Sequence, residues 1–248
     1  MPDRVRTSRP SRSGVVWDAL REVLAEQAGA GAATLDVVDV GGGTGGFAVP
    51  LAELGHRVTV VDPSPDALAS LERRAGEAGV QVRAVQGDAA ELLDVVPADG
   101  ADLLLCHGVL EHVDAVEPAI DALAGALRPG GTISVLAANR NAAVLARAVA
   151  GHFAEARHAL DDPAGRWGPG DPLPRRFTEE ELVAVLVAAD LSVRTVHGVR
   201  GFSDLVPGAL ADGDPGAAEA LQDLEAATAD LASFRALATQ LHVLADKA

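Results

Sequence analysis

The residues best suited to chemistry are glycines and carboxylates near the start of the chain. Residues 41–46 read Gly-Gly-Gly-Thr-Gly-Gly, with Asp39 just before them and Asp62 at the end of the next apolar run. Glycine has no Cβ and tolerates positive φ, so such a loop turns tightly and lets a ligand approach its backbone. A carboxylate in the position of Asp62 can accept hydrogen bonds from both hydroxyls of a ribose. The pattern predicts a nucleoside-binding site, the alternative being a glycine-rich turn that binds nothing.

The acidic residue at position 39 distinguishes between two kinds of nucleotide site. Gly41, Gly43 and Gly46 also fit the G-x-G-x-x-G pattern of dinucleotide sites, so the glycines alone are ambiguous. A carboxylate repels a pyrophosphate but attracts the ammonium group of an amino-acid tail. With Asp39, the loop resembles the D-x-G-x-G-x-G segment of class I S-adenosylmethionine (SAM) methyltransferases. The resemblance implies SAM as cofactor and S-adenosylhomocysteine (SAH) as its product, and an NAD-dependent oxidoreductase is the weaker alternative.

The apolar pattern around these residues predicts an α/β fold. Leu35, Val37, Val38 and Val40 form a short run typical of a strand buried on both faces. A helical pattern follows the glycines, and strands and helices then alternate along the chain. We expect a Rossmann-like class I methyltransferase fold, in which helices cover both faces of a seven-stranded, mostly parallel sheet with an antiparallel last strand. The six further strands are expected at residues 56–61, 80–85, 101–106, 132–137, 191–202 and 237–245.

Length and composition limit the possible classes of protein. The chain has 248 residues, 48% of them hydrophobic, which suffices for one α/β core. We expect a disordered Arg-rich tail over residues 1–14 and a single domain over 15–248, with a cap or insert around 139–177. A lone cysteine, Cys106, excludes an internal disulfide and a multi-cysteine metal site, and no apolar run reaches the length of a membrane span. These features predict a metal-free cytoplasmic protein that does not bind a membrane.

Nearly the whole chain, from Trp17 to Val243, is similar to one methyltransferase family. The shared order is V-W-x-x-L, D-V-G-G-G-T-G, H-G-V-L-E-H-V, L-R-P-G-G, A-N-x-N, A-G-H-F, P-R-R-F-T, G-V-R-G-F and L-H-V. These motifs resemble the tRNA 5-carboxymethoxyuridine carboxyl methyltransferases, which esterify the carboxylate of a wobble uridine. The resemblance implies a SAM-dependent enzyme that O-methylates a carboxylate, either in tRNA or in a small-molecule acid. The net charge of −16 repels phosphate backbones at long range, and no DNA partner is expected.

The resemblance also assigns cofactor contacts at the ends of the first four strands. In such enzymes the Gly87-Asp88-Ala89 turn contacts adenine, and the segment that begins at His107 borders the methyl donor. Asp88 is also a candidate N-cap for a short helix. The expected cofactor-binding residues are Asp39, Gly41, Gly43, Gly45, Asp62, Asp88, Ala89 and His107.

The chemistry of a carboxylate acceptor favours arginine as its binding partner. A carboxylate is already ionised at pH 7 and needs no general base, but it needs donors that orient one of its oxygens. The planar guanidinium fork suits that task. Arg200 is the first candidate for a catalytic role of this kind. The predicted substrate-binding residues are Asn139, Arg140, Arg175, Arg176 and Arg200.

His112 supports an alternative function. An imidazole can exchange a proton near neutral pH, so His112 is a candidate general base for a small-molecule hydroxyl or amine acceptor. A packing histidine is the competing interpretation, and a non-catalytic SAM-binding protein is a further alternative. The expected partner is a small-molecule or tRNA acceptor, and the protein is expected to be a monomer or homodimer.

A long irregular segment precedes the last third of the chain. Residues 161–176 contain four prolines and three glycines, which predicts a loop. Loops of this length are usually functional or disordered, and Trp167 within it favours a lid. Thr178 and Glu181 then have the spacing of a capping box, which predicts the start of a helix.

Overall fold

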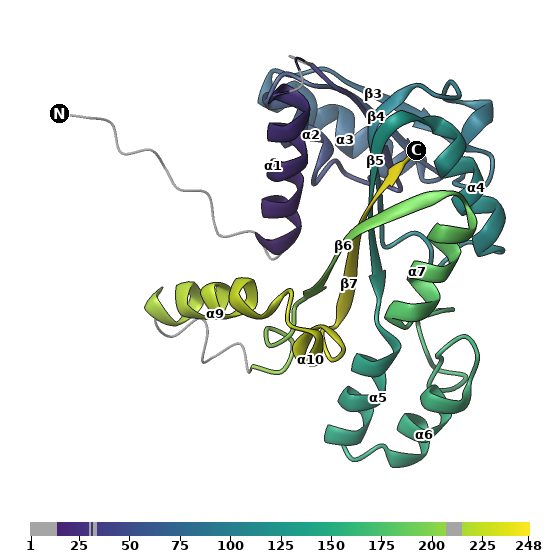
Figure 1. Ribbon diagram of the computed structural model, residues 1–248, viewed down its shortest axis with the longest axis vertical. Helices are drawn as coiled ribbons and strands as arrows, with labels where there is room; N and C mark the ends of the chain where they lie inside the picture. Colours follow the sequence, from purple (N-terminus) through teal and green to yellow (C-terminus); the bar gives the residue numbers. More distant parts are fainter. Residues whose placement is uncertain (1–13, 30, 32–33, 207–214) are drawn as a thin grey trace.

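The computed structural model describes residues 14–29, 31, 34–206 and 215–248, and its centre is a seven-stranded sheet (Figure 1). The strand order is β3-β2-β1-β4-β5-β7-β6, and β7 runs antiparallel to both of its neighbours. The predicted Rossmann-like fold class is confirmed. The predicted tail lies outside the described residues, apart from Gly14, where α1 begins. The strands are β1 (Asp36–Val40), β2 (Arg57–Asp62), β3 (Val82–Gln86), β4 (Ala101–His107), β5 (Leu127–Ala138), β6 (Leu191–Val199) and β7 (Gln240–Lys247).

The register of the parallel strands brings the predicted site segments to one edge of the sheet. Val40, the last residue of β1, lies opposite Val61 of β2 and Cys106 of β4. His107, at the end of β4, lies opposite Leu136 near the end of β5. The segments that follow β1, β2, β4 and β5 therefore leave the sheet at the same edge, which we call the carboxyl edge. In open α/β sheets, ligands bind in the crevice at this edge.

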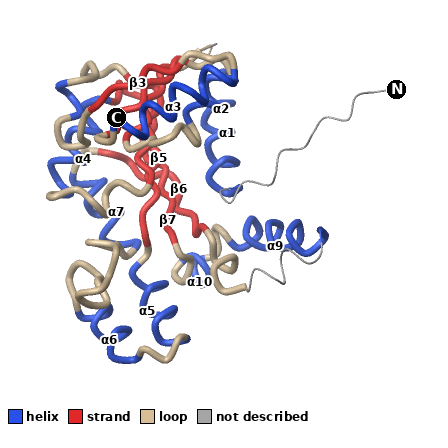
Figure 2. Tube along the Cα trace, turned by 180° about the vertical axis from the view of Figure 1, so that it is seen from behind, coloured by secondary structure: helices blue, strands red, loops and turns tan. Residues whose placement is uncertain are grey.

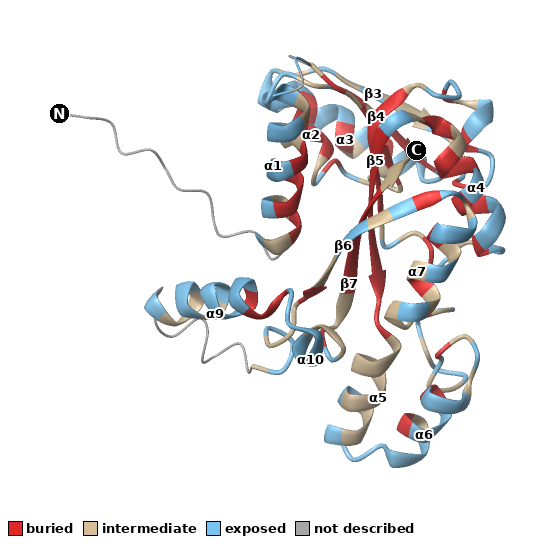
Figure 3. Ribbon diagram, in the orientation of Figure 1, coloured by how far each residue is buried: buried red, intermediate tan, exposed pale blue. Residues whose placement is uncertain are grey.

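Helices cover both faces of the sheet. The helices α1 (Gly14–Gly29), α2 (Ala48–Glu53) and α3 (Pro65–Ala78) pack on one face, and α4 (Val116–Ala126) and α7 (Glu179–Ala188) pack on the other. Along β4, Leu103 and Leu105 join the first core, whereas Leu104 and Cys106 join the second. Because successive side chains of a strand point to opposite faces, a strand covered on both sides is apolar throughout. Figure 3 shows the buried residues concentrated along these strands.

A helical hairpin extends beyond the end of β5. The helix α5 (Arg140–Val149) follows β5 directly, and α6 (Phe153–Asp161) packs beside it, as both ribbon views show (Figures 1 and 2). The sequence predicts a loop and one helix over this stretch, but Gly151, with φ of +81°, ends the first helix and allows a second to begin. We call residues 139–177, which contain this hairpin and the loop after it, the cap.

The last two strands differ from the prediction at one end each. The strand β6 stops at Val199 instead of about residue 202, because Arg200 adopts φ of +61° and the next three N–H groups donate to the Glu225 carboxylate. The strand β7 begins at Gln240 rather than at residue 237, because the chain just before it is helical. The remaining helices are η1 (Leu92–Asp94), α9 (Pro215–Thr228) and α10 (Ala232–Arg235).

Candidate active site

The loop after β1 is fixed by hydrogen bonds to its neighbours. Gly41 N donates to the Val61 carbonyl at 2.7 Å, and Gly43 N donates to Asp62 Oδ2 at 2.9 Å. Arg74 of α3 donates to the carbonyl of Thr44 at 2.8 Å. The glycine loop is therefore held by β2 and α3, and its shape does not depend on a bound ligand.

Glycine is required at three positions of this loop. Gly41, Gly43 and Gly45 have φ angles of +67°, +54° and +80°, a region that strains other residues. A Cβ atom at Gly41 would overlap the side chain of Val109, and one at Gly45 would overlap Leu71. The glycines thus keep side chains off the backbone and let the loop touch the segment that follows β4.

Asp39 is buried beside the glycine loop with one oxygen unpaired. The residue is 3% exposed, and its Oδ2 has no hydrogen-bond partner among the described residues. A Cβ atom on Gly42 would collide with that oxygen, which places it against the loop. Burial, and secondarily the charge of Asp62, raise the pKa of this carboxyl from 3.8 to about 7. A buried carboxylate is costly unless a donor or cation completes it, and the ammonium group of SAM is such a cation. The residues present therefore fit this cofactor.

Asp62 is held in position by the backbone around it. Its Oδ2 accepts from Gly43 N, and its Oδ1 accepts from Ser64 N at 2.8 Å. The residue is 7% exposed. Each carboxylate oxygen can accept more than one hydrogen bond, so capacity remains for a ribose. The arrangement fits the predicted nucleoside contact.

The turn after β3 has a different local role from the one expected. Asp88 is exposed, and its Oδ1 accepts from Ala90 N at 3.0 Å, which closes a turn. The N-cap of the following 3-10 helix is Glu91, so Asp88 does not cap that helix. Ala89 is buried. Contacts of Asp88 and Ala89 with adenine stay predictions.

His107 lies at the carboxyl edge beside two aromatic rings. Its ring edge contacts Phe47, with 4.7 Å between the ring centroids, and Phe47 stacks on Trp17 of α1 at 5.0 Å. The Nε2 atom lies 2.8 Å from Ser134 Oγ, whereas Nδ1 is buried without a partner in the described part of the chain. Burial lowers the pKa of His107 to about 3, so the ring is neutral at pH 7. The imidazole is therefore an oriented neutral group at the site.

Three of the arginines predicted to bind the acceptor form ion pairs within the protein. These pairs are Arg140 with Glu181, Arg176 with Asp171, and Arg200 with Asp204. A guanidinium that is already paired has fewer donors left for a substrate carboxylate. The guanidinium fork that the sequence predicts is therefore engaged, and a role for these arginines toward an acceptor stays a prediction.

Two other predicted acceptor residues support the shape of the site. Arg175 donates to the carbonyls of Leu110 and Val113 at 3.2 and 2.9 Å, which fixes the segment after β4. Asn139 is buried, and its side chain caps α5 while its amide donates to the chain just before β7. His112 is exposed on the turn after β4, so its predicted role as a base stays untested.

A cavity of about 240 Å³ opens between the end of β5 and the cap. The Arg147 guanidinium lies over the Trp167 ring, 3.8 Å from its centroid, and both residues line the cavity. The remaining wall is mainly small or apolar, and it includes Ala142, Ala143, Ala146, Leu205 and Leu237. The cavity therefore suits a ligand with an apolar body.

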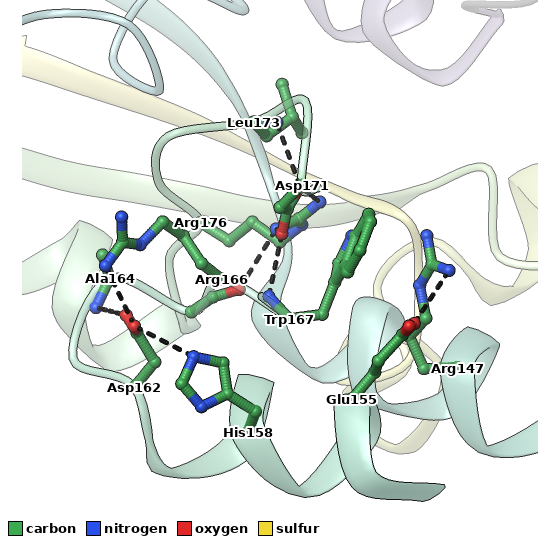
Figure 4. A network of polar contacts seen from close by, with 11 residues as sticks. Arg147, Glu155, His158, Asp162, Ala164, Arg166, Trp167, Asp171, Leu173 and Arg176 are labelled. Carbon is green, nitrogen blue, oxygen red and sulfur yellow. Dashed lines mark hydrogen bonds and ion pairs between the residues drawn. The ribbon is translucent and has the colours of Figure 1, made fainter. Parts of the chain in front are cut away.

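The loop between α6 and α7 is built around a buried carboxylate (Figure 4). Asp171 has a fully buried side chain and accepts from Trp167 N at 2.9 Å and Leu173 N at 3.0 Å. Arg176 donates to both of its oxygens, at 2.6 and 2.9 Å. Figure 4 shows Trp167 beside this network and turned toward Arg147. The predicted loop is thus ordered by one side chain, and a lid function for Trp167 stays a prediction.

A larger cavity lies away from these residues. Its volume is about 990 Å³, and it opens near the amino ends of β1–β3, where Asp36, His56, Arg57 and Arg83 line it. It contains no residue of the glycine loop. The 240 Å³ cavity, at the carboxyl edge, is therefore the one placed beside the predicted donor site.

The described part of the chain was also compared with two other kinds of site. Among these residues, no group of three or more His, Cys, Asp or Glu side chains could hold a metal ion. None of the described helices is both long and apolar enough to cross a membrane.

Known proteins of one class are similar to this chain. Residues 38–135 match the family described as a methyltransferase domain. The chain is 30% identical, over 95% of its length and 88% of the relative, to a tRNA 5-carboxymethoxyuridine methyltransferase of Escherichia coli O157:H7. It is 33% identical, over 66% of its length and 61% of the relative, to a ubiquinone biosynthesis O-methyltransferase of Methylocella silvestris. A SAM-dependent methyltransferase from Mesorhizobium loti has the same fold, with a TM-score of 0.63, 22% identity and coverage of 96% and 100% of the two chains.

The sheet order, the glycine loop with its carboxylates and these matches define a class I SAM-dependent methyltransferase. Within that class, the chain belongs to the family of the tRNA 5-carboxymethoxyuridine methyltransferases. SAM is therefore the methyl donor, as the sequence predicts. The fold is shared with a magnesium protoporphyrin IX methyltransferase from Synechocystis with bound SAH, at a TM-score of 0.61, 15% identity and coverage of 98% and 90%.

The affinity for SAH should rise with pH as Asp39 loses its proton. The ammonium group of SAH is attracted by the ionised carboxyl and not by the neutral one. With a pKa of about 7 in the ligand-free protein, Asp39 is mostly neutral at pH 6 and mostly ionised at pH 8. We expect the Kd to fall by up to about tenfold per pH unit between pH 5 and 7 and to level off above pH 8. Isothermal titration calorimetry across this range measures the effect.

Asp39→Asn is the matched control, because it removes the titrating group at nearly constant volume. Its Kd for SAH should be weak and independent of pH. The ligand-free variant should be more stable than the wild type at pH 8. Folded Asp39 keeps its proton up to about pH 7, whereas the unfolded chain releases it near 3.8, so wild-type stability falls through this window as pH rises. The loss is up to roughly 4 kcal/mol. A variant with the wild-type pH dependence would show that another group binds the ammonium.

Proposed function

We propose that this protein transfers the methyl group of SAM to an oxygen atom of a small-molecule acceptor. The observation that favours a small molecule over tRNA is the pairing of the cations. The chain has 20 Lys and Arg residues, and four of these lie in residues 1–13, which leaves 16 in the described part. Thirteen of the 16 lie within 4.0 Å of a carboxylate oxygen. The other three are Arg74, Arg83 and Arg175.

Paired cations are poor partners for a polyanion. Proteins that bind nucleic acid neutralise several phosphates with Lys and Arg, and much of the affinity comes from this contact. On the described surface, most cations are instead compensated by carboxylates beside them, and the net charge of −16 adds long-range repulsion. The E. coli relative is named for a tRNA nucleoside, but a small acceptor places no such demand on the surface.

The cavity beside the cap offers the acceptor a place at the carboxyl edge. Its volume of about 240 Å³ corresponds to roughly eight water molecules at about 30 Å³ each, which suits one substituted aromatic ring. The alanines of α5 form one wall, and Trp167 presents a flat apolar surface. An acceptor with an aromatic or apolar body is therefore the best match.

Two kinds of acceptor oxygen remain. A carboxylate oxygen follows from the family resemblance and needs no base. A hydroxyl oxygen must lose a proton, and the relatives named ubiquinone biosynthesis O-methyltransferases give it support. Two observations favour the hydroxyl: the arginines predicted to hold a carboxylate are engaged elsewhere, and His107 Nδ1 is buried without a partner in the described chain.

The chain's own residues supply binding and orientation for the reaction. Bound SAM supplies a methyl group on a cationic sulfur, which an oxygen nucleophile displaces in line. Asp62 and the glycine loop would hold the nucleoside, and Asp39 would hold the ammonium end. The cap would position the acceptor and keep water away from it.

One probe compares both acceptor types in a single molecule. 4-Hydroxybenzoate carries a carboxylate and a phenolic hydroxyl on one ring, and it can be incubated with the protein and methyl-tritiated SAM beside a parallel reaction with tRNA. Dilute alkali releases methanol from a methyl ester but not from a methyl ether. We expect label in 4-hydroxybenzoate and none in tRNA. Label in tRNA alone would refute the small-molecule acceptor, and SAH binding without any transfer would favour the non-catalytic alternative.

A further inference from the structure

A row of polar side chains crosses four adjacent strands of the sheet. His107 Nε2 of β4 lies 2.8 Å from Ser134 Oγ of β5, which lies 2.8 Å from His242 Nε2 of β7. His242 Nδ1 lies 3.1 Å from His197 Nδ1 of β6. His197 Nε2 lies 3.5 Å from Asp230 Oδ1, whose side chain is 78% exposed. The row therefore leads from the carboxyl edge to the solvent.

Polar groups inside this core need a compensating interaction. Ser134 and His242 are fully buried, and their strand neighbours Leu136 and Leu244 belong to the core that α1–α3 cover. Burial of such groups is costly unless hydrogen bonds replace water, and the row provides these bonds for its internal atoms. His107 Nδ1 is the exception, since it is buried and has no partner among the described residues. The row thus ends in an unsatisfied atom at the active site.

The direction of the hydrogen bonds follows from the groups that form them. A carboxylate can only accept, so Asp230 orients the row with the His197 proton on Nε2. His197 Nδ1 then accepts from the Nδ1–H group of His242, and His242 Nε2 accepts from the Ser134 hydroxyl. Ser134 Oγ in turn accepts from the Nε2–H group of His107. In this order, His107 Nδ1 has no proton and presents a buried lone pair.

The direction argument requires neutral rings, and the surroundings keep them neutral. Burial lowers the pKa of His107 to about 3, and it lowers the pKa of His242 well below the usual value, with a smaller effect of the neighbouring rings. Burial also lowers the pKa of His197, although two nearby carboxylates oppose it. The charged groups that act on His197 are Asp230, Glu22 and Arg235.

His107 also has a suitable place in the fold. It ends β4, and Val109, two residues later, lies against Gly41 of the glycine loop. Phe47 covers its ring edge and is itself stacked on Trp17. Aromatic cover of this kind keeps water from competing for a proton. The exposed His112 has no comparable position in the row.

We propose that His107 Nδ1 accepts the proton of a hydroxyl acceptor and that the row passes a proton on to Asp230. The proposal rests on the proposed function and narrows the acceptor to one with an O–H group. The acceptor oxygen gains the methyl group, the electron pair of the broken C–S bond stays on sulfur, and the hydroxyl proton moves to Nδ1. Protons then shift from His107 to Ser134, from Ser134 to His242, from His242 to His197, and from His197 to Asp230 or water. The positive charge of the donor leaves as this proton, and every ring ends neutral.

Nitrogen-15 NMR of histidine-labelled protein tests the direction of the row without any acceptor. Two-bond couplings distinguish the Nε2–H form of a neutral ring from the Nδ1–H form. At pH 7 we expect His107 and His197 to carry the proton on Nε2 and His242 to carry it on Nδ1. A proton on Nδ1 of His107, or a charged His107, would overturn the proposal.

Asp230→Asn tests whether the row acts as one unit. An amide can donate as well as accept, so the variant loses the group that sets the direction, and His107 should populate both neutral forms. Asp223→Asn is the matched control, because Asp223 is an exposed carboxylate of α9 outside the row. A His107 spectrum that is unchanged in Asp230→Asn would refute the coupling.

The tritium assay provides the functional arm. Ser134→Ala should lower kcat for 4-hydroxybenzoate by about 10²–10⁴-fold, the usual contribution of general-base catalysis, and should leave the Kd for SAH within about twofold. It should also change the solvent deuterium isotope effect on kcat, which a packing role would not. A methyl ester as product would overturn this proposal and leave the proposed function standing. Failure of all transfer would instead count against the proposed function, and the NMR forms of His107 would still decide the direction of the row.

Discussion

Asp62→Ala should weaken SAH binding by about a hundredfold to ten-thousandfold. The carboxylate accepts from Gly43 N and Ser64 N, so it shapes the glycine loop and presents its remaining lone pairs at the carboxyl edge. A hydrogen bond to a charged group contributes about 1.5–3 kcal/mol, and two such bonds to a ribose amount to roughly 3–6 kcal/mol. Isothermal titration calorimetry at pH 8, where Asp39 is ionised in the wild type, measures the change.

Asp66→Ala is the control for this variant. Asp66 lies in the first turn of α3 and is exposed. Its removal should leave the Kd for SAH within about twofold. If Asp62→Ala binds SAH as tightly as Asp66→Ala does, and both variants have the wild-type circular dichroism spectrum, the nucleoside does not bind at the end of β2.

Asp171→Asn should destabilise the protein by about 3–5 kcal/mol. Removal of one partner of a buried ion pair leaves the other charge uncompensated, and a cost of this size is typical. Here the remaining charge is Arg176, which is itself buried, and the backbone of Trp167 and Leu173 loses a strong acceptor as well. Urea unfolding followed by circular dichroism gives the free energy of unfolding.

The same carboxylate should make the protein acid-sensitive. Burial alone would raise the pKa of Asp171, but the hydrogen bonds from Arg176, Trp167 and Leu173 outweigh it and hold the pKa below its usual value. A lowered pKa means that the stabilisation is present above the unfolded value, near 4, and is lost as pH falls through the folded value. The free energy of unfolding should therefore fall in acid for the wild type and less for Asp171→Asn.

An exposed ion pair in the same cap serves as the control for Asp171→Asn. Asp161 lies 2.5 Å from Arg157, but both side chains are more than half exposed. Exposed pairs contribute about 0–1 kcal/mol, so Asp161→Asn should change stability by less than about 1 kcal/mol. Equal effects of the two variants would show that the Asp171 network does not hold the loop.

The two carboxylates at the glycine loop have opposite energetic roles. Asp62 is satisfied by backbone donors, whereas Asp39 is buried with one oxygen that finds no partner in the described chain. The first therefore stabilises the ligand-free fold, and the second destabilises it above pH 7 until a cation binds. Such local strain at a binding site is a common feature of functional residues.

The donor class could be predicted from the sequence because its signals are local. The apolar run before residue 41 specifies a strand buried on both faces, and the glycines specify positive φ within a few residues of each other. Thr178 and Glu181 form the predicted capping box for the same reason, since both partners lie within one helical turn. The end of β6 could not be predicted, because the Glu225 that draws the backbone away from the strand is more than 20 residues distant.

Only the tertiary structure decided which polar groups are available for chemistry. Arginines 140, 175, 176 and 200 look alike in the sequence as donors near site loops, but each has partners that the folded chain brings to it. The His107 row shows the same limit, because Ser134 and His242 lie 108 residues apart and meet only through the strand order β4-β5-β7-β6. By itself, the sequence determined the strands, the glycine turn and the donor, which depend on neighbouring residues. The groups that face the acceptor depend on long-range pairing, and a periodic pattern carries no information about which distant side chain will arrive.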